Sequence, residues 1–75
     1  METAYSRALD AHIRRTGQTQ HGFGRTVGYS QGAIWQWLRG YRLPGKRAAK
    51  LLDEITNGDV PFSLWKAARI ERLDA

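Results

Sequence analysis

The sequence predicts a small all-α domain of four to five short helices, and three observations support this fold class. The chain has 75 residues, which is enough for one domain with a thin hydrophobic core. Apolar residues recur at the spacing of amphipathic helices in several segments. Glycines and capping residues divide these segments into pieces of helical length. We therefore expect a single domain over residues 1–75.

The first predicted helix runs from near Thr3 to Thr16. Its apolar residues repeat at helical spacing and are Tyr5, Ala8, Leu9 and Ile13. Thr3 can cap the start of the helix, and Gly17 ends it. His12 lies close to the apolar stripe, but the chain has only one other histidine and no cysteine. We interpret His12 as a structural or solvent-facing residue and predict no metal site.

Residues 20–39 are predicted to form two short helices joined by a tight turn. The first helix is expected over Gln20–Val27, with Thr19 as its N-cap. The second is expected over Ser30–Arg39, where the Ser30 hydroxyl can accept a hydrogen bond from a free backbone N–H group. This arrangement is a helix-turn-helix unit, and the rest of the chain is expected to pack around it.

The faces of this helix pair have different chemistry. Gly24 lacks a side chain, so the second helix can cross there closely, and Gly28 can adopt the left-handed backbone that leaves the first helix. The residues predicted to face inward are Phe23, Val27, Ile34, Trp37 and Leu38. Those predicted to face outward from the second helix are Gln31, Gly32, Trp35, Gln36 and Arg39. A helix that exposes glutamines, an arginine and a flat aromatic ring suits the major groove of DNA.

The fourth predicted helix runs from about Lys46 to Thr56. Pro44 is expected in its first turn, and Asn57-Gly58 ends it. Its predicted apolar stripe contains Ala48, Leu51, Leu52 and Ile55.

Residues 62–75 form a tail with a weaker pattern. Ser63 can cap a short helix whose inward residues are Leu64, Trp65 and Ala68. Ile70 and Leu73 do not share that face, so they could serve a partner chain, or the end of the helix could fray.

The charge distribution indicates a polyanionic partner. The net charge is +5, and no Asp or Glu occurs from Ala11 through Leu52. The cations of this segment are Arg14, Arg15, Arg25, Arg39, Arg42, Lys46, Arg47 and Lys50. Such a basic stretch over the helix pair is typical of nucleic-acid binding, and the alternative is a basic surface that serves solubility.

Several classes of protein are disfavoured by the sequence. No apolar run approaches the ~20 residues that span a bilayer, and no leader pattern opens the chain, so we expect a cytoplasmic protein without a membrane role. The absence of cysteine excludes disulfides. The basic segment contains no carboxylate that could act as a base, and the histidines lack a paired carboxylate in local sequence. We therefore predict no catalytic residues, no cofactor and no small-molecule ligand.

The helix pair also carries residues that match a known family. These are Gln20, Gly24, Val27-Gly28, Ser30-Gln31-Gly32-Ala33-Ile34 and Trp37-Leu38-Arg39-Gly40, together with Thr56-Asn57-Gly58-Asp59-Val60 after the fourth helix. In order and spacing they resemble the small phage repressors of the lambda-type Cro group and the related YdaS-type family, over roughly Ala8 to Val60. Trp35 departs from that pattern, since such proteins often have a small or polar residue there, and the tail after Pro61 has no match.

The resemblance implies a lambda-repressor-like domain that binds double-stranded DNA in a sequence-specific manner and regulates transcription. A repressor of phage or prophage origin, acting in a bacterial or phage-infected cell on a pseudo-palindromic operator, would be expected. Gln31 and Gln36 can each pair with adenine through the side-chain amide. Trp35 can pack on a thymine methyl group or on sugar carbons, and its alternative role is a core or dimer contact.

Contacts to the DNA backbone are predicted separately from base contacts. The candidates are Thr19, Gln20, His21, Arg25, Arg42 and Lys46, with Arg39 able to reach a flanking phosphate as well. For each basic residue alone, a solvated surface position is the alternative. Tyr41 could donate to a phosphate or pack on the fourth helix.

Homodimerisation on DNA is expected because two half-sites are needed for useful specificity. The predicted dimer contacts are Phe62, Leu64 and Trp65. One alternative is an antitoxin-like module that binds a partner through the tail, which predicts an exposed apolar patch of Leu64, Trp65, Ile70 and Leu73. A further alternative is single-stranded nucleic-acid binding through Tyr29, Trp35 and Tyr41.

Overall fold

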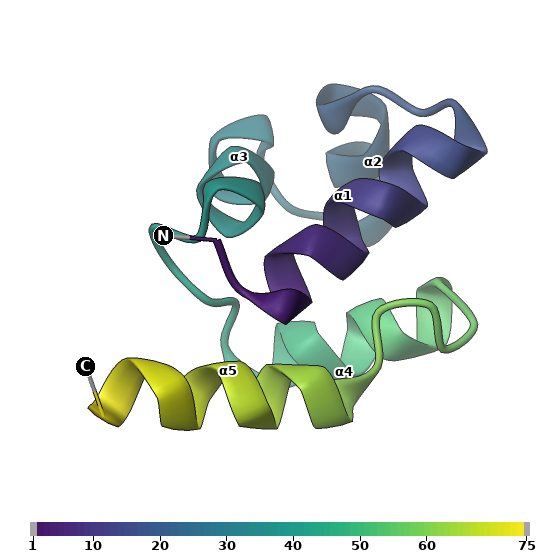
Figure 1. Ribbon diagram of the computed structural model, residues 1–75. Coiled ribbons are helices and arrows are strands. Elements are labelled where there is room, and N and C mark those ends of the chain that lie inside the picture. Colours follow the sequence, from purple (N-terminus) through teal and green to yellow (C-terminus); the bar gives the residue numbers. More distant parts are fainter. Residues whose placement is uncertain (1, 75) are drawn as a thin grey trace.

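A computed structural model describes residues 2–74 of the chain, with side chains for residues 2–71. It contains five helices, α1 (Ala4–Thr16), α2 (Gln20–Val27), α3 (Gln31–Arg39), α4 (Lys46–Ile55) and α5 (Phe62–Asp74), and the described residues form no strand. In Figure 1, α2 and α3 lie on one side of α1, and α4 and α5 lie on the other side and run in opposite directions. The all-α prediction is confirmed.

The first three helices begin where local sequence predicts. The side chains of Thr3, Thr19 and Ser30 each accept a hydrogen bond from the backbone N–H three residues ahead. At Thr3 the bond is reciprocated, because the Ser6 hydroxyl accepts from the Thr3 N–H at 2.8 Å. These bonds satisfy donors that a helix start leaves without a partner, so each start is defined by residues next to it in sequence.

The core lies around α1, between the α2–α3 pair and the α4–α5 pair. Its buried hydrophobic residues include the predicted inward residues of α1, α2 and α3, except Ala8, which is half-buried. They are Tyr5, Leu9, Ile13, Phe23, Val27, Ile34, Trp37, Leu38, Ala48, Ala49, Leu52, Val60, Trp65 and Ala68. The predicted stripe of α4 is partly wrong. Ile55, the last residue of α4, is 38% exposed, whereas Ala49 is fully buried.

The connection before α4 also differs from the prediction. Pro44 lies outside the helix, because Gly45 is the N-cap residue and Lys46 the first helical residue. Pro44 is buried, and its carbonyl accepts a hydrogen bond from the Trp65 indole N–H at 2.7 Å. The α3–α4 connection is thereby fastened to α5.

The tail forms a 13-residue helix, and Ser63 does not cap it. The Asp53 carboxylate accepts a hydrogen bond from the Phe62 N–H at 2.8 Å, so a side chain from α4 satisfies the start of α5. Trp65 and Ala68 face the core as predicted, and Leu64 is half-buried against it. Ile70 is 59% exposed. The side chain of Leu73 lies outside the described residues.

His12 joins the end of α1 to the α4–α5 connection. Its Nδ1 lies 2.9 Å from Oδ2 of Asp59, and Arg15 pairs with the same carboxylate. Burial lowers the pKa of His12, and the positive charge of Arg15 acts in the same direction. A neutral His12 can still donate its Nδ1–H to Asp59. The interpretation of His12 as a structural residue therefore agrees with its contacts.

None of the helices within residues 2–74 has both the length and the apolar character that crossing a membrane requires.

Candidate nucleic-acid interface

The geometry of the α2–α3 pair depends on two glycines. A Cβ atom placed on Gly24 would lie 2.5 Å from the carbonyl oxygen of Tyr29, so no larger residue fits there without moving the turn. Gly28 has a φ angle of 84°, in the left-handed region that glycine favours. The N–H groups of Gly28 and Tyr29 both donate to the Gly24 carbonyl, at 2.8 and 2.9 Å. The predicted close crossing at Gly24 is confirmed, and it sets the position of α3 relative to α2.

The outer face of α3 has the predicted composition, with one correction. Gln31, Gly32, Trp35 and Arg39 are exposed, and the exposed fraction of Trp35 is 41%. Gln36 is half-buried and not exposed as predicted, because residues 41–45 run alongside the end of α3. It lines a shallow hollow together with Tyr29, Ala33, Trp37, Arg42, Leu43, Pro44 and Gly45.

Trp35 and Arg39 of α3 and Tyr41 just after it form a cluster of side-chain contacts. The rings of Trp35 and Tyr41 meet edge to face, with centroids 5.3 Å apart, and the Arg39 guanidinium carbon lies 5.7 Å from the Trp35 ring centroid. Such contacts favour one orientation of the exposed indole. The exposure of Trp35 excludes the alternative of a core residue. Tyr41 packs against α3, a contact that sequence reasoning missed because it depends on the path of the chain after Gly40.

Gly32 is the one position on this face with no side chain, and the protein does not require a glycine there. A Cβ atom on Gly32 would have the Ser30 hydroxyl oxygen at 3.9 Å as its nearest neighbour, which is an ordinary contact distance. This is the opposite of Gly24, where the backbone of the turn occupies the space. The surface of α3 at Gly32 is therefore a place where a partner can approach the helix backbone.

The start of α2 is the predicted phosphate-binding end. The Thr19 hydroxyl oxygen accepts a hydrogen bond from the Gly22 N–H at 2.9 Å, and the Thr19 carbonyl accepts one from Phe23 at 2.9 Å. His21 is exposed and Gln20 is half-buried. The helix dipole and the first N–H groups of α2 favour an anion at this end.

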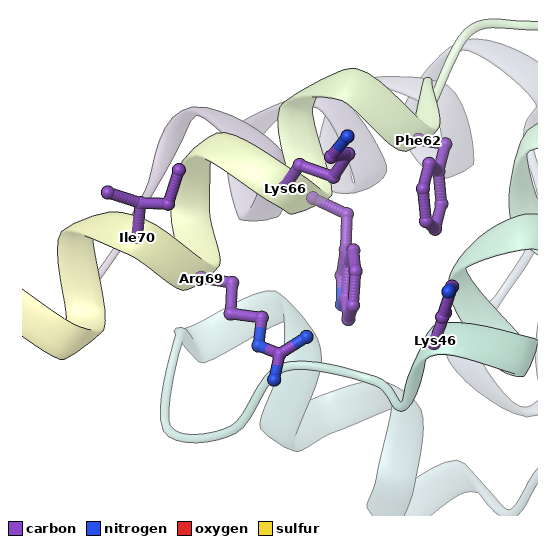
Figure 2. Close-up of a pocket in the computed structure, with 6 residues that line it drawn as sticks. Lys46, Phe62, Lys66, Arg69 and Ile70 are labelled. Atoms are coloured by element: carbon purple, nitrogen blue, oxygen red, sulfur yellow. The ribbon is translucent and has the colours of Figure 1, made fainter.

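The predicted phosphate-contacting cations do not all lie together. Arg25 on α2 is exposed, and Arg42 borders the same hollow as Gln36, so both flank the α2–α3 pair. Lys46 is different, because its side chain borders a groove between α4 and α5 (Figure 2).

Three of the acids outside the basic segment are used in structural contacts. Asp10 pairs with Arg14, Asp59 pairs with His12 and Arg15, and the Asp53 carboxylate accepts a hydrogen bond from the Phe62 N–H.

The predicted dimer residues are largely used within their own chain. Trp65 is 5% exposed and stacks on Phe62, with ring centroids 5.0 Å apart. Phe62 and Leu64 are half-buried against the core. Trp65 therefore has little surface left for a second copy, and the proposed dimer contact has only Phe62 and Leu64 to use.

The described residues contain no group of three or more His, Asp or Glu side chains that could hold a metal ion. Comparisons with protein-family models, with curated proteins and with solved structures gave no match.

Proposed function

We propose that this protein is a sequence-specific regulator that binds double-stranded DNA and places α3 in the major groove. The observation that supports this most strongly is the outer face of α3. That face exposes an amide, an indole and a guanidinium, and the opposite face of the same short helix is buried in the core. An exposed helix of this composition can present both donors and acceptors to base edges.

Each exposed residue has a distinct proposed role. The Gln31 amide offers a donor and an acceptor and can pair with adenine, and Arg39 can donate to guanine. Trp35, oriented by Tyr41, packs on a thymine methyl group or on sugar carbons. Gly32 allows the helix backbone to approach the base edges. Gln36 is placed at the side of the helix and is a weaker candidate for base contact than Gln31.

Phosphate contacts would orient α3 in the groove. We assign them to the start of α2, through Thr19, Gln20 and His21, and to Arg25 and Arg42 on either side. The absence of acids between Ala11 and Leu52 keeps this surface positive. A regulator of this kind is expected to act as a dimer on a pseudo-palindromic operator, most simply as a repressor of the Cro-like or YdaS type.

Selection of bound duplexes from a random pool tests the proposal directly. We expect enrichment of a short sequence, repeated as an inverted pair about one helical turn apart if two copies bind. The same selection with Gln31→Ala provides the matched comparison, since it should relax the preference at one base position. A pool that shows no enriched sequence, with binding that depends only on salt, would contradict sequence-specific recognition.

A further inference from the structure

The face opposite the α2–α3 pair contains a groove of about 330 Å³ between the start of α4 and α5 (Figure 2). It is lined by Lys46, Phe62, Trp65, Lys66, Arg69 and Ile70. These residues come from only two helices, and Ile70 at one end is 59% exposed. The volume is at the lower end of the range for binding cavities, roughly 300–1,000 Å³.

The floor of the groove is aromatic and held in place. Phe62 and Trp65 stack with ring centroids 5.0 Å apart and an angle of 23° between their planes. The Trp65 indole N–H donates to the Pro44 carbonyl at 2.7 Å, and the Asp53 carboxylate accepts from the Phe62 N–H at 2.8 Å. The Trp65 ring is thus anchored by the α3–α4 connection and the backbone of Phe62 by α4, so the floor exists before any partner binds.

The rim of the groove is positive. The Arg69 guanidinium carbon lies 5.6 Å from the Trp65 ring centroid, and Nζ of Lys50, which is outside the groove lining, lies 5.6 Å from the Phe62 ring centroid. Lys46 and Lys66 add two more cations beside them. Aromatic rings carry no net charge, so these contacts orient the cations without neutralising them. Within the described part of the chain, no carboxylate lines the groove.

We propose that this groove binds an acidic segment of a partner protein, with one aromatic or branched aliphatic side chain packed against Phe62 and the exposed Ile70, while the buried Trp65 supports Phe62 by stacking on it. The anchor would remove apolar surface from water, and the flanking carboxylates would pair with Lys46, Lys66 and Arg69. A segment is favoured over a small molecule because the lining comes from two helices only. A second copy of this chain is disfavoured because a symmetric contact would bring the same cations together.

The inference does not depend on DNA binding, since Lys66 and Arg69 have no proposed role there. The probe is a fluorescein-labelled octapeptide in which one phenylalanine and one leucine are flanked by aspartate and glutamate. Its control has alanine at both apolar positions. We expect saturable binding by fluorescence anisotropy, with affinity lower by about tenfold for the alanine peptide because the anchor is lost.

Charge-reversed variants test the location of the site. Lys66→Glu should weaken peptide binding on the order of tenfold, and Arg69→Glu should do the same. Arg47→Glu is the matched control, because it makes the same charge change on an exposed residue of α4 that does not line the groove. It should reduce the affinity much less. Lys66 has no assigned contact in the fold, so it remains informative if Arg69→Glu is destabilised by loss of the Trp65 contact.

Two-dimensional NMR shows where the peptide binds. We expect shifts of the Trp65 indole N–H and of the backbone amides of Lys66 and Ile70, with smaller changes on α3. Equal binding of both peptides, or an equal loss for Arg47→Glu and Lys66→Glu, would overturn the proposal in favour of non-specific charge attraction. If the same resonances shift with protein concentration alone, the groove binds a second copy of this chain instead. If they shift on addition of duplex DNA alone, the groove binds DNA instead.

Discussion

Replacement of Gly32 by alanine should affect folding and DNA binding in opposite directions. The added methyl group would lie 3.9 Å from the Ser30 hydroxyl oxygen and would meet no closer atom beyond its chain neighbours and the backbone of its own helix. Gly32 has ordinary helical geometry on the exposed face of α3. Because alanine loses less backbone entropy on folding, Gly32→Ala should raise the free energy of unfolding by up to about 1 kcal/mol.

The same methyl group should weaken DNA binding. If the backbone of α3 lies against base edges at Gly32, the methyl occupies space that the DNA needs, and the helix must move outward. The loss of one good base contact costs roughly 1–3 kcal/mol, which is about 5- to 150-fold in affinity. Thermal unfolding followed by circular dichroism measures the first effect. Anisotropy titrations of the selected duplex at fixed salt measure the second.

Gly24→Ala is the control for glycine replacement in the same helix pair. Its Cβ would lie 2.5 Å from the Tyr29 carbonyl oxygen, so the turn itself must shift. We expect a loss of stability of about 1–3 kcal/mol or more, as for other overpacked sites. A Gly32→Ala protein that is more stable and binds the duplex as tightly as the wild type would refute close approach of α3 to DNA. A less stable one would refute the structure at that position.

The remaining predictions concern recognition, electrostatics and the core. Gln31→Ala should lose roughly 1–3 kcal/mol of discrimination at one base position, measured with a panel of single-substitution duplexes, and an equal loss on every duplex would exclude direct base contact by this residue. Arg42→Ala should weaken binding to all sequences and reduce the log–log salt slope by about 0.9, whereas an unchanged slope would remove Arg42 from the interface. Tyr5→Phe should maintain or raise stability by about 1 kcal/mol in urea unfolding, because the buried Tyr5 hydroxyl has no hydrogen-bond partner among the described residues, and a loss above that size would indicate a partner such as an internal water.

Sequence reasoning succeeded where the determining residues are neighbours in the chain. Thr19 caps α2 through a bond to Gly22, and Gly28 ends it with a left-handed backbone, so both ends of that helix were predictable. The predicted inner and outer faces of α3 follow from helical periodicity alone.

Sequence reasoning failed where the determining contact is distant. The start of α5 depends on Asp53, nine positions before Phe62, and no local rule for caps identifies such a partner. Gln36 was predicted to be as exposed as Gln31, but residues 41–45 fold back beside it. The same segment places Tyr41 against Trp35. The path of this connection depends on a contact at its end, where the Pro44 carbonyl accepts a hydrogen bond from the Trp65 indole N–H.

Lys46 borders the groove and follows the α3–α4 connection that contains Arg42. It is the first residue of α4. A carboxylate bound in that groove would pair with Lys46 and lower the positive potential that favours DNA phosphates nearby. If both proposals hold, an acidic partner and DNA would therefore weaken each other's binding. Thermodynamic linkage requires that each ligand lowers the affinity for the other by the same factor. The change in peptide affinity on adding duplex must therefore equal the change in duplex affinity on adding peptide.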